Sequence, residues 1–485
     1  MQQTDKVSRN VSSIFIGRGV EMLITLVSVT LIARNLGVEQ YGLFSSVVAL
    51  TVLISKFIDL GFAPIVFRES SKKDASFEML NTAFTIRIIL FFALFVVYNS
   101  VSFLTNLTSG ETLLSNILFL NIIFSSKYMN FRELLEVLFK VNLNMFNVMM
   151  FNTLDSFFLL VLVILMPYVG GGLQYLVIVY VLANVPGFLL LIIFLKKKYS
   201  YKFSHSFKHG YWLVKESLPL FGTVVLSTTF QQLDVLLLRS IDSEYSVGLY
   251  SAALRLTVPL GIIPQALVLT VFPLIVRAKE MGNEGTMPAT RLVYKILFLF
   301  SFSISFIVTF KAEPIISLVF GSEYASAYLP MTILFWSILF YYFNLFSLNL
   351  MTIYHKQKYN FIVTLLIVII QILLIAFLAK IYSYTGVAVA RVAAAGAGTI
   401  LYIYLLHGIG IRFNFLSKRI IKWLILFSGG IILISFLPFY LYLLLTVIFS
   451  MIITFKLNYF APEEVTMLLR AVNYDSWKGK FKWLK

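Results

Sequence analysis

Ionisable side chains are rare inside the long apolar stretches of this chain, and they are the groups with the most chemistry to offer. The cations among them are Arg18, Lys56, Arg87, Arg255 and Arg391, and the acids are Glu21, Asp59, Asp155 and Asp234. A charge at the centre of a membrane-spanning helix costs about 2.5–3.5 kcal/mol on insertion scales. If the stretches cross a membrane, each group needs a partner of opposite charge, a water-filled cavity or a functional role.

Two of the cations have an acid nearby on the same predicted helix. Arg18 and Glu21 are three residues apart, as are Lys56 and Asp59, so each pair shares one helical face. Local neutralisation is the simplest interpretation of both pairs. Arg18 lies only about two turns from the inner end of its helix, so lining a cavity and extending its head group to the interface are equally good interpretations.

Arg87, Arg255 and Arg391 have no acid three or four residues away in the sequence. This favours ligand binding, with pairing to Asp155 or Asp234 across helices as the alternative. A guanidinium group is planar, stays charged and binds two oxygens of one phosphate. Several such groups would attract a diphosphate and repel cationic drugs. Arg391 is the weakest candidate, because it lies about two turns from the predicted outer surface and could extend to the interface.

The acids are the groups at this depth that could carry a proton. Asp59 is interpreted as the partner of Lys56. This leaves Asp155 and Asp234 as candidates for binding a coupling cation. Pairing of each with an arginine of a neighbouring helix is the alternative.

Other kinds of chemistry have little support in the sequence. The chain has no cysteine, and its four histidines, His205, His209, His355 and His407, all fall in polar connections. It contains no glycine-rich phosphate loop, no histidine pair at metal-ligand spacing and no serine elbow. We therefore expect no enzyme activity, no cofactor and no metal.

The composition requires lipid as the solvent for most of the chain. Hydrophobic residues make up 59% and charged residues 13% of the 485 residues, and the mean hydropathy is +0.90. In lipid, helices and closed barrels satisfy all backbone hydrogen bonds. The apolar runs are continuous and lack the alternation of barrel strands. The sequence therefore predicts an all-α polytopic membrane protein.

Apolar stretches of about twenty residues predict the transmembrane helices. There are fourteen, near 11–33, 42–66, 80–104, 112–126, 148–168, 174–195, 217–238, 248–275, 292–312, 327–353, 361–379, 385–406, 421–437 and 440–456. The fourth helix could continue through Phe131 to Lys140. The last two spans could instead form a re-entrant hairpin broken at Pro438.

Basic residues separate the two sides of the membrane. With the N-terminus inside, 30 of the 39 basic residues fall in inner segments, and the outer loops hold only Arg34, Arg239, Lys311 and Lys380. Cytoplasmic loops are enriched in Lys and Arg, so both termini are predicted to be cytoplasmic. The same pattern accounts for the net charge of +17 without a nucleic-acid partner.

A repeat and a polar connection predict two lobes. The segment YGLFSSVVAL at 41–50, which opens the second span, recurs as VGLYSAALRL at 247–256, which opens the eighth. This predicts a parallel repeat about an axis along the membrane normal. The predicted parts are an N-terminal six-helix lobe at 1–195, a cytoplasmic linker at 196–216, a C-terminal six-helix lobe at 217–410, an additional helix pair at 411–456 and a basic cytoplasmic tail at 457–485.

Two further segments have a predicted role. PLGIIP, from Pro259 to Pro264, interrupts the eighth span just after Arg255 and frees backbone groups that must face protein or water. A site and a structural kink are equally good interpretations. The tail mixes Trp477 and Trp483 with lysines, which predicts an interfacial anchor to anionic lipid.

Several motifs resemble one family. LIARNLGVEQYGLFSS, FQQLDVLLLRSIDSEYSVGLYSAALRL, IPQALVLTVFPLIVR and IISLVFGSEYASAYLP are similar, in this order, to segments of the polysaccharide flippases in the multidrug/oligosaccharidyl-lipid/polysaccharide exporter superfamily. The resemblance covers most of the chain up to about Lys422. It implies a V-shaped, cationic cavity between two lobes that work by alternating access.

The resemblance also implies a substrate and a location. The substrate would be an undecaprenyl-diphosphate-linked repeat unit of O-antigen (lipopolysaccharide) or capsule, moved from the inner to the outer leaflet of the bacterial cytoplasmic (inner) membrane. Implied partners are this lipid-linked oligosaccharide, membrane lipids, a polysaccharide polymerase and a chain-length regulator. The alternatives, in decreasing order, are a lipid II or teichoic-type flippase, a cation-coupled multidrug exporter and a membrane glycosyltransferase or polymerase.

Overall fold

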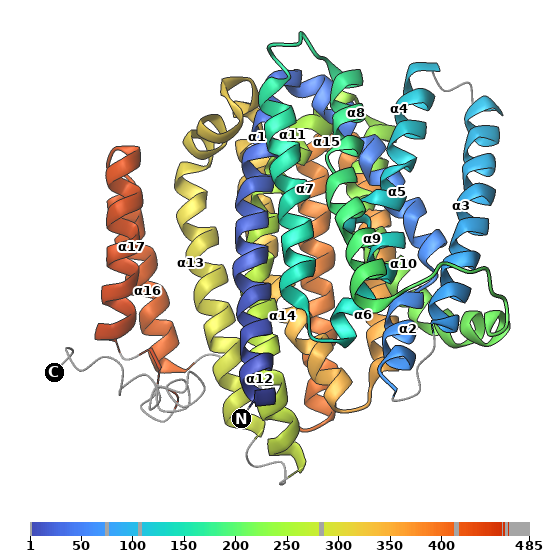
Figure 1. Cartoon of the computed structure of the whole chain (residues 1–485). Helices are drawn as coiled ribbons and strands as arrows, with labels where there is room; N and C mark the ends of the chain where they lie inside the picture. The colour runs from blue at the N-terminus through green and yellow to red at the C-terminus, as the bar shows by residue number, and fades with distance from the viewer. Residues whose placement is uncertain are drawn as a thin grey trace. The chain divides into compact units, whose positions relative to one another are not determined.

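The computed structural model describes residues 2–72, 77–104, 109–280, 286–411, 417–457, 459–460 and 464. Every regular element within these ranges is a helix (Figure 1). The predicted all-α fold is therefore confirmed. The helices form because a chain in lipid has no water to satisfy its backbone groups, and each helix satisfies its own backbone hydrogen bonds.

The number of spans also agrees with the prediction. Ten of the described helices are long and apolar enough to cross a membrane. Two of them hold two predicted spans each: α1, Gln2–Asp59, is broken at Gly37, and α15, Gln357–Gly408, is broken at Ser383. The remaining two spans are α16, Lys418–Ile434, and the short apolar stretch Gly110–Phe124.

Packing divides the chain into two compact units. Unit 1 comprises Met1–Ala252 and Ile375–Tyr384, and unit 2 comprises Ala253–Leu374 and Thr385–Lys485. These are units of packing. The lobes predicted from the sequence, which are defined by the repeat, stay a prediction.

Unit 1 begins with α1. Its other helices are α2, Phe62–Ser70; α3, Glu78–Leu104; α4, Ser109–Phe119; α5, Asn121–Phe124; α6, Phe131–Val141; α7, Met145–Leu165; α8, Leu173–Leu182; α9, Val185–Tyr199; α10, Gly210–Ile241; and the greater part of α11, Glu244–Thr257. α7 lies along α1 (Figure 1). A core between α2, α6, α7 and α9 includes Leu134, Phe139, Phe151 and Leu191, all fully buried.

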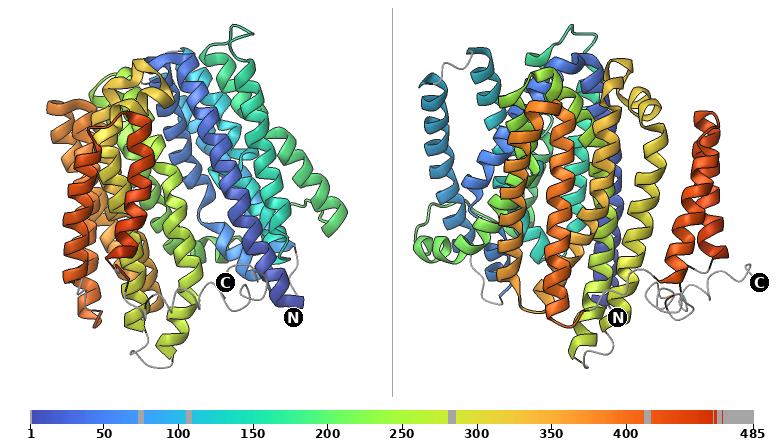
Figure 2. Two further views of the ribbon diagram at one scale, coloured as in Figure 1. Left: turned by 90° about the vertical axis from the view of Figure 1, so that its left-hand side faces the viewer. Right: turned by 180° about the vertical axis from the view of Figure 1, so that it is seen from behind.

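Unit 2 contains the broken end of the eighth span and the C-terminal helices. They are the 3₁₀ turn η2, Val258–Gly261; α12, Ile262–Glu280; α13, Thr286–Phe320; α14, Tyr328–Ile353; most of α15; α16; and α17, Phe439–Lys456. α16 and α17 lie side by side (Figure 2) and both contact α13. The rings of Trp423 and Phe427 stack at 4.6 Å, and the Phe302 ring of α13 packs against both.

Two predicted elements differ from the structure. The fourth span does not continue to Lys140, because Ser125 is extended and Met129 is left-handed, so α6 is a separate helix. α10 begins at Gly210, inside the predicted linker. The predicted interruption at Pro259 is present as the 3₁₀ turn η2. The predicted anchor at 458–485 lies almost wholly outside the described residues.

The two copies of the repeat touch each other in unit 1. A Cβ atom on Gly42 would overlap the backbone carbonyl of Glu244, and a Cβ on Gly248 would overlap that of Val38. Residue 248 is 206 positions beyond 42, and 244 is 206 positions beyond 38, so the contact is reciprocal. This exchange of equivalent partners is what a two-fold relation between the copies requires.

Candidate functional site

Arg87 is enclosed in unit 1. It lies on α3 and is 0% exposed. Its guanidinium forms an ion pair with the Asp59 carboxylate at the end of α1 and donates a 2.7 Å hydrogen bond to the Asn130 carbonyl. It also lies 5.9 Å from the centre of the Phe62 ring. These contacts join α1, α2 and α3 to the turn before α6.

Lys56 lies in the same buried network. Its Nζ donates a 2.8 Å hydrogen bond to the Tyr128 carbonyl, and the side chain is 7% exposed. The Asn130 amide in turn donates a 2.6 Å hydrogen bond to the Ser55 carbonyl. The predicted pairing of Lys56 with Asp59 is present as an electrostatic attraction, whereas the ion-pair contact of Asp59 is with Arg87. Arg87 reaches the carboxylate from a neighbouring helix, and Lys56 binds a carbonyl instead.

Asp155 has an arginine partner that the sequence analysis did not single out. Arg132 on α6 forms an ion pair with Asp155 and a 3.0 Å hydrogen bond with Asn152, both on α7. Its Nε also contacts Glu136 at 3.3 Å. The signal that could have identified this residue is FRELLEVLFK, where Arg132 and Glu136 are four residues apart on an amphipathic helix.

The charges of these two clusters balance. The cations are Lys56, Arg87, Arg132 and Lys140, and the acids are Asp59, Glu133, Glu136 and Asp155. Lys140 lies 3.6 Å from Glu133 and 3.8 Å from Glu136, which completes the set on α6. A buried charge is tolerated when it is paired and hydrogen-bonded. The charges within these two clusters therefore neutralise one another.

The other predicted residues of unit 1 have different surroundings. Asp234 on α10 is 0% exposed and accepts a hydrogen bond from the Tyr250 hydroxyl of α11. Arg18 on α1 is exposed, and Glu21, one turn later, is half-buried. Of these three, Arg18 is the exposed residue.

The two remaining arginines lie in unit 2. Arg255, near the end of α11, and Arg391, on α15, are both half-buried. The acids between residues 253 and 456 are Glu280, Glu284, Glu313 and Glu323, and all four fall outside the predicted spans or at their ends. The spans of unit 2 therefore carry a net positive charge at membrane depth.

Arg391 lies beside polar groups that the sequence did not single out. Tyr341 of α14 is within electrostatic reach of Arg391, and its hydroxyl is hydrogen-bonded by the Gln265 side chain of α12. Gly261 of η2 adjoins the same hydroxyl. A Cβ atom added to Gly261 would lie 3.8 Å from it. The predicted break after Arg255 thus adjoins this cluster.

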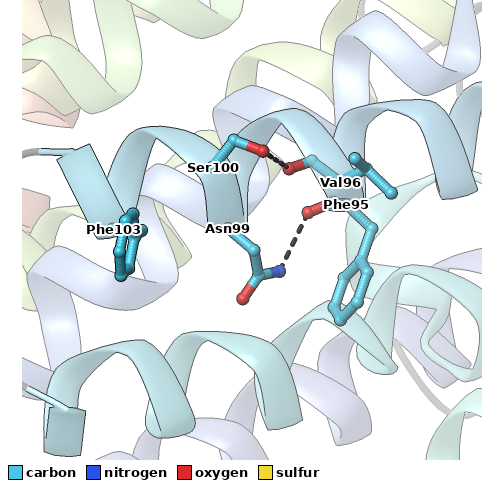
Figure 3. A pocket seen from close by; sticks show the side chains of 5 residues that line it. All are labelled: Phe95, Val96, Asn99, Ser100 and Phe103. Atoms are coloured by element: carbon cyan, nitrogen blue, oxygen red, sulfur yellow. Dashed lines mark hydrogen bonds between the residues drawn. The ribbon is translucent and has the colours of Figure 1, made fainter.

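A shallow hollow on α3 is a weaker candidate. Figure 3 shows its lining: Phe95, Val96, Asn99, Ser100 and Phe103. The Asn99 amide donates to the Phe95 carbonyl at 2.9 Å, and Asn99 and Asn116 exchange two hydrogen bonds. Because the hollow has no charged group, it is a poor site for a charged ligand.

Comparisons with known proteins show which family this chain matches. A model of the polysaccharide biosynthesis protein family matches residues 7–279. A search of curated proteins finds no match. Among solved structures, the lipid II flippase MurJ in an inward closed conformation is 16% identical with a TM-score of 0.74, covering 94% of this chain and 98% of that chain.

Transporters of a second kind also share the fold. An inward-facing multidrug resistance MATE transporter of the MOP superfamily is 16% identical with a TM-score of 0.60, covering 80% of this chain and 95% of that chain. An outward-facing one is 16% identical with a TM-score of 0.55, covering 84% and 96%. With a family match over more than half of its length, this chain belongs to the polysaccharide biosynthesis protein family and has the fold of a multi-pass MOP-superfamily transporter.

Proposed function

We propose that the protein moves an undecaprenyl-diphosphate-linked oligosaccharide repeat unit, of O-antigen or capsule type, from the cytoplasmic to the outer leaflet by alternating access. The observation that carries this proposal is the net positive charge of the unit 2 spans, which hold Arg255 and Arg391 and no acid at that depth. A diphosphate is the anionic part of such a lipid and is bound well by guanidinium groups. The family match supports a glycan as the rest of the ligand.

The proposed binding cations of unit 2 are Arg255 and Arg391, and Arg18 is the candidate in unit 1. Arg255 and Arg391 are half-buried and Arg18 is exposed, so none of the three is enclosed by protein as Arg87 is. Arg87 and Lys56 are assigned to the structure of unit 1 instead, because both are buried among protein partners. This narrows the five cations of the sequence analysis to three.

A lipid II flippase is the second candidate. The similarity to lipid II flippase MurJ, with a TM-score of 0.74, favours it, and lipid II also presents a diphosphate. A cation-coupled drug exporter is a poorer fit. The acids Asp59, Asp155 and Asp234 all lie in unit 1, the first two in ion pairs and the third hydrogen-bonded by Tyr250.

The membrane potential is the proposed source of energy. One charge moved through 100 mV is worth about 2.3 kcal/mol, and a diphosphate crossing toward the positive side is driven by it. The proposed setting is the bacterial inner membrane with both termini in the cytoplasm, and a polysaccharide polymerase and a chain-length regulator are proposed partners.

The test is deletion of the gene in its natural host. Lipid-linked repeat units should accumulate in the cytoplasmic leaflet and surface polysaccharide should disappear. Re-expression of the wild-type chain should restore both, whereas Arg255→Ala should not. Normal surface polysaccharide combined with drug hypersensitivity would refute the proposal. Loss of cell-wall synthesis with intact surface polysaccharide would favour the lipid II alternative.

A further inference from the structure

Three polar side chains from three helices of unit 2 lie near one another. They are Gln265 of α12, Tyr341 of α14 and Arg391 of α15. Gln265 hydrogen-bonds the Tyr341 hydroxyl, and Arg391 lies within electrostatic reach of the same group. Tyr341 is the fourteenth residue of the 26-residue helix α14, so the cluster lies near the middle of that span.

The surrounding helices fix this arrangement. Asn344, one turn after Tyr341, donates a 2.9 Å hydrogen bond to the Ala395 carbonyl and accepts one of 2.8 Å from Thr399. Ala395 lies one turn after Arg391. The bonds of Asn344 hold α14 against α15 one turn away from Tyr341 and Arg391. These two residues therefore lie on the facing sides of α14 and α15.

The two adjacent tyrosines of α14 have different surroundings. Tyr342 is fully buried, and its hydroxyl donates a 2.6 Å hydrogen bond to the Leu260 carbonyl in the η2 turn. Tyr341 is 41% exposed. Tyr342 therefore holds α14 against the η2 turn, whereas Tyr341 is only partly covered by protein.

The three side chains of the cluster carry groups that can bind a sugar next to a phosphate. An exposed aromatic ring with a polar tip can stack on the apolar face of a pyranose. A side-chain amide both donates to and accepts from hydroxyl and acetamido groups. A guanidinium binds phosphate oxygens. A ligand or water beside such groups would suit their position near the middle of a span, where contact with lipid alone is costly.

We propose that Tyr341 and Gln265 form a subsite for the first sugar of the lipid-linked glycan, with Arg391 holding the adjoining phosphate. The inference rests on the proposed function and extends it, because it assigns recognition of the glycan to residues other than the cations. Tyr341 stacks on the sugar ring, and Gln265 both orients the Tyr341 hydroxyl and binds the sugar. The polyprenyl tail has no part in this subsite.

The experiment compares two probes on the purified full-length protein in lipid nanodiscs: undecaprenyl diphosphate, and the same lipid carrying one N-acetylglucosamine. The wild type should bind the glycosylated probe more tightly. Tyr341→Ala should reduce that preference by up to about tenfold, because it removes the stacking ring, and Tyr341→Phe should keep most of it. Arg391→Ala should weaken both probes equally.

Tyr342→Phe is the matched control, since it removes a neighbouring hydroxyl that is bonded to protein. It should lower the thermal stability and leave the preference unchanged. The inference is overturned if the wild type binds both probes equally, or if Tyr341→Ala keeps the wild-type preference. Failure of the wild type to bind either probe would instead contradict the proposed function.

Discussion

The charged groups at membrane depth are used differently in the two units. In unit 1, Arg87 and Arg132 are fully buried, and each forms an ion pair with an acid of another helix. In unit 2, Arg255 and Arg391 are half-buried in spans whose sequence holds no acid. An arginine inside a span is therefore not by itself evidence of a binding site. Its burial and its partners decide whether it serves the structure or a ligand.

The difference has a physical consequence. A charge pair enclosed by protein contributes to the stability of one packing arrangement, and removing one partner leaves the other charge uncompensated. A half-buried cation can exchange water for a phosphate ligand at much lower cost. Substitutions in unit 1 should therefore affect folding, and those in unit 2 should affect transport.

The largest expected effect is on the ion pairs of unit 1. Arg87→Ala should destabilise the protein by about 3–5 kcal/mol, because it leaves the buried Asp59 carboxylate without its partner. The measurement is membrane abundance together with thermal unfolding of the purified protein. The double variant Arg87→Gln with Asp59→Asn should recover part of the loss. Normal abundance of Arg87→Ala combined with lost transport would return Arg87 to the binding site.

The next effect concerns Arg255 and Arg391. Alanine at either position should lower transport by roughly 10- to 100-fold, the value of a charge-assisted hydrogen bond to phosphate, with abundance unchanged. Lysine should restore part of the activity, since it keeps the charge and loses the two-point contact. Flipping in proteoliposomes measures this. Full activity of an alanine variant would show that the charge there is dispensable.

A substitution in the reciprocal contact of Gly42 and Gly248 tests whether close backbone packing also stabilises unit 1. Gly42→Val should force α1 and α11 apart, because the added Cβ overlaps the Glu244 carbonyl, at a cost of about 1–3 kcal/mol. The natural chain has no cysteine, so spin labels at Glu39→Cys and Tyr245→Cys report the distance directly. Gly110→Val, where a Cβ meets nothing within 4 Å, is the control. An unchanged distance in Gly42→Val would contradict the packing argument.

A smaller effect is expected at Asp234. Its carboxylate accepts a hydrogen bond from Tyr250, and the amide oxygen of Asp234→Asn can accept the same bond. The variant should keep the wild-type pH dependence of flipping, measured with the pH gradient and the potential clamped separately. A pH dependence lost in Asp234→Asn would identify this residue as the carrier of a coupling proton.

The smallest effect is expected outside the spans, at Asp242. Partial burial alone would raise the pKa of Asp242, but hydrogen bonds from Ser383, Ser246 and Ser243 hold it below the usual value. A lowered pKa contributes stability at higher pH, and this contribution is lost as the pH falls below about 3.9. Ser383→Ala should reduce the thermal stability slightly at pH 7 and match the wild type at the acid end. An equal difference at all pH values would exclude this linkage.

The sequence by itself determined the spans and the internal repeat of this protein. Hydropathy over about twenty residues is sufficient for a span, because each transmembrane helix satisfies its own backbone. The repeat at Gly42 and Gly248 was visible because close helix packing requires the same small residue at both equivalent positions.

Only the tertiary structure decided which charges are partners. Lys56 and Asp59 share a helical face, yet Asp59 pairs with Arg87, which is 28 residues away in the chain. Asp155 pairs with Arg132, and the packing of α14 against α15 brings Tyr341 within electrostatic reach of Arg391. Such contacts depend on how each helix is rotated toward its neighbours. That rotation is set by the packing of whole helix surfaces and by breaks such as Ser125 and Met129, which no local spacing reveals.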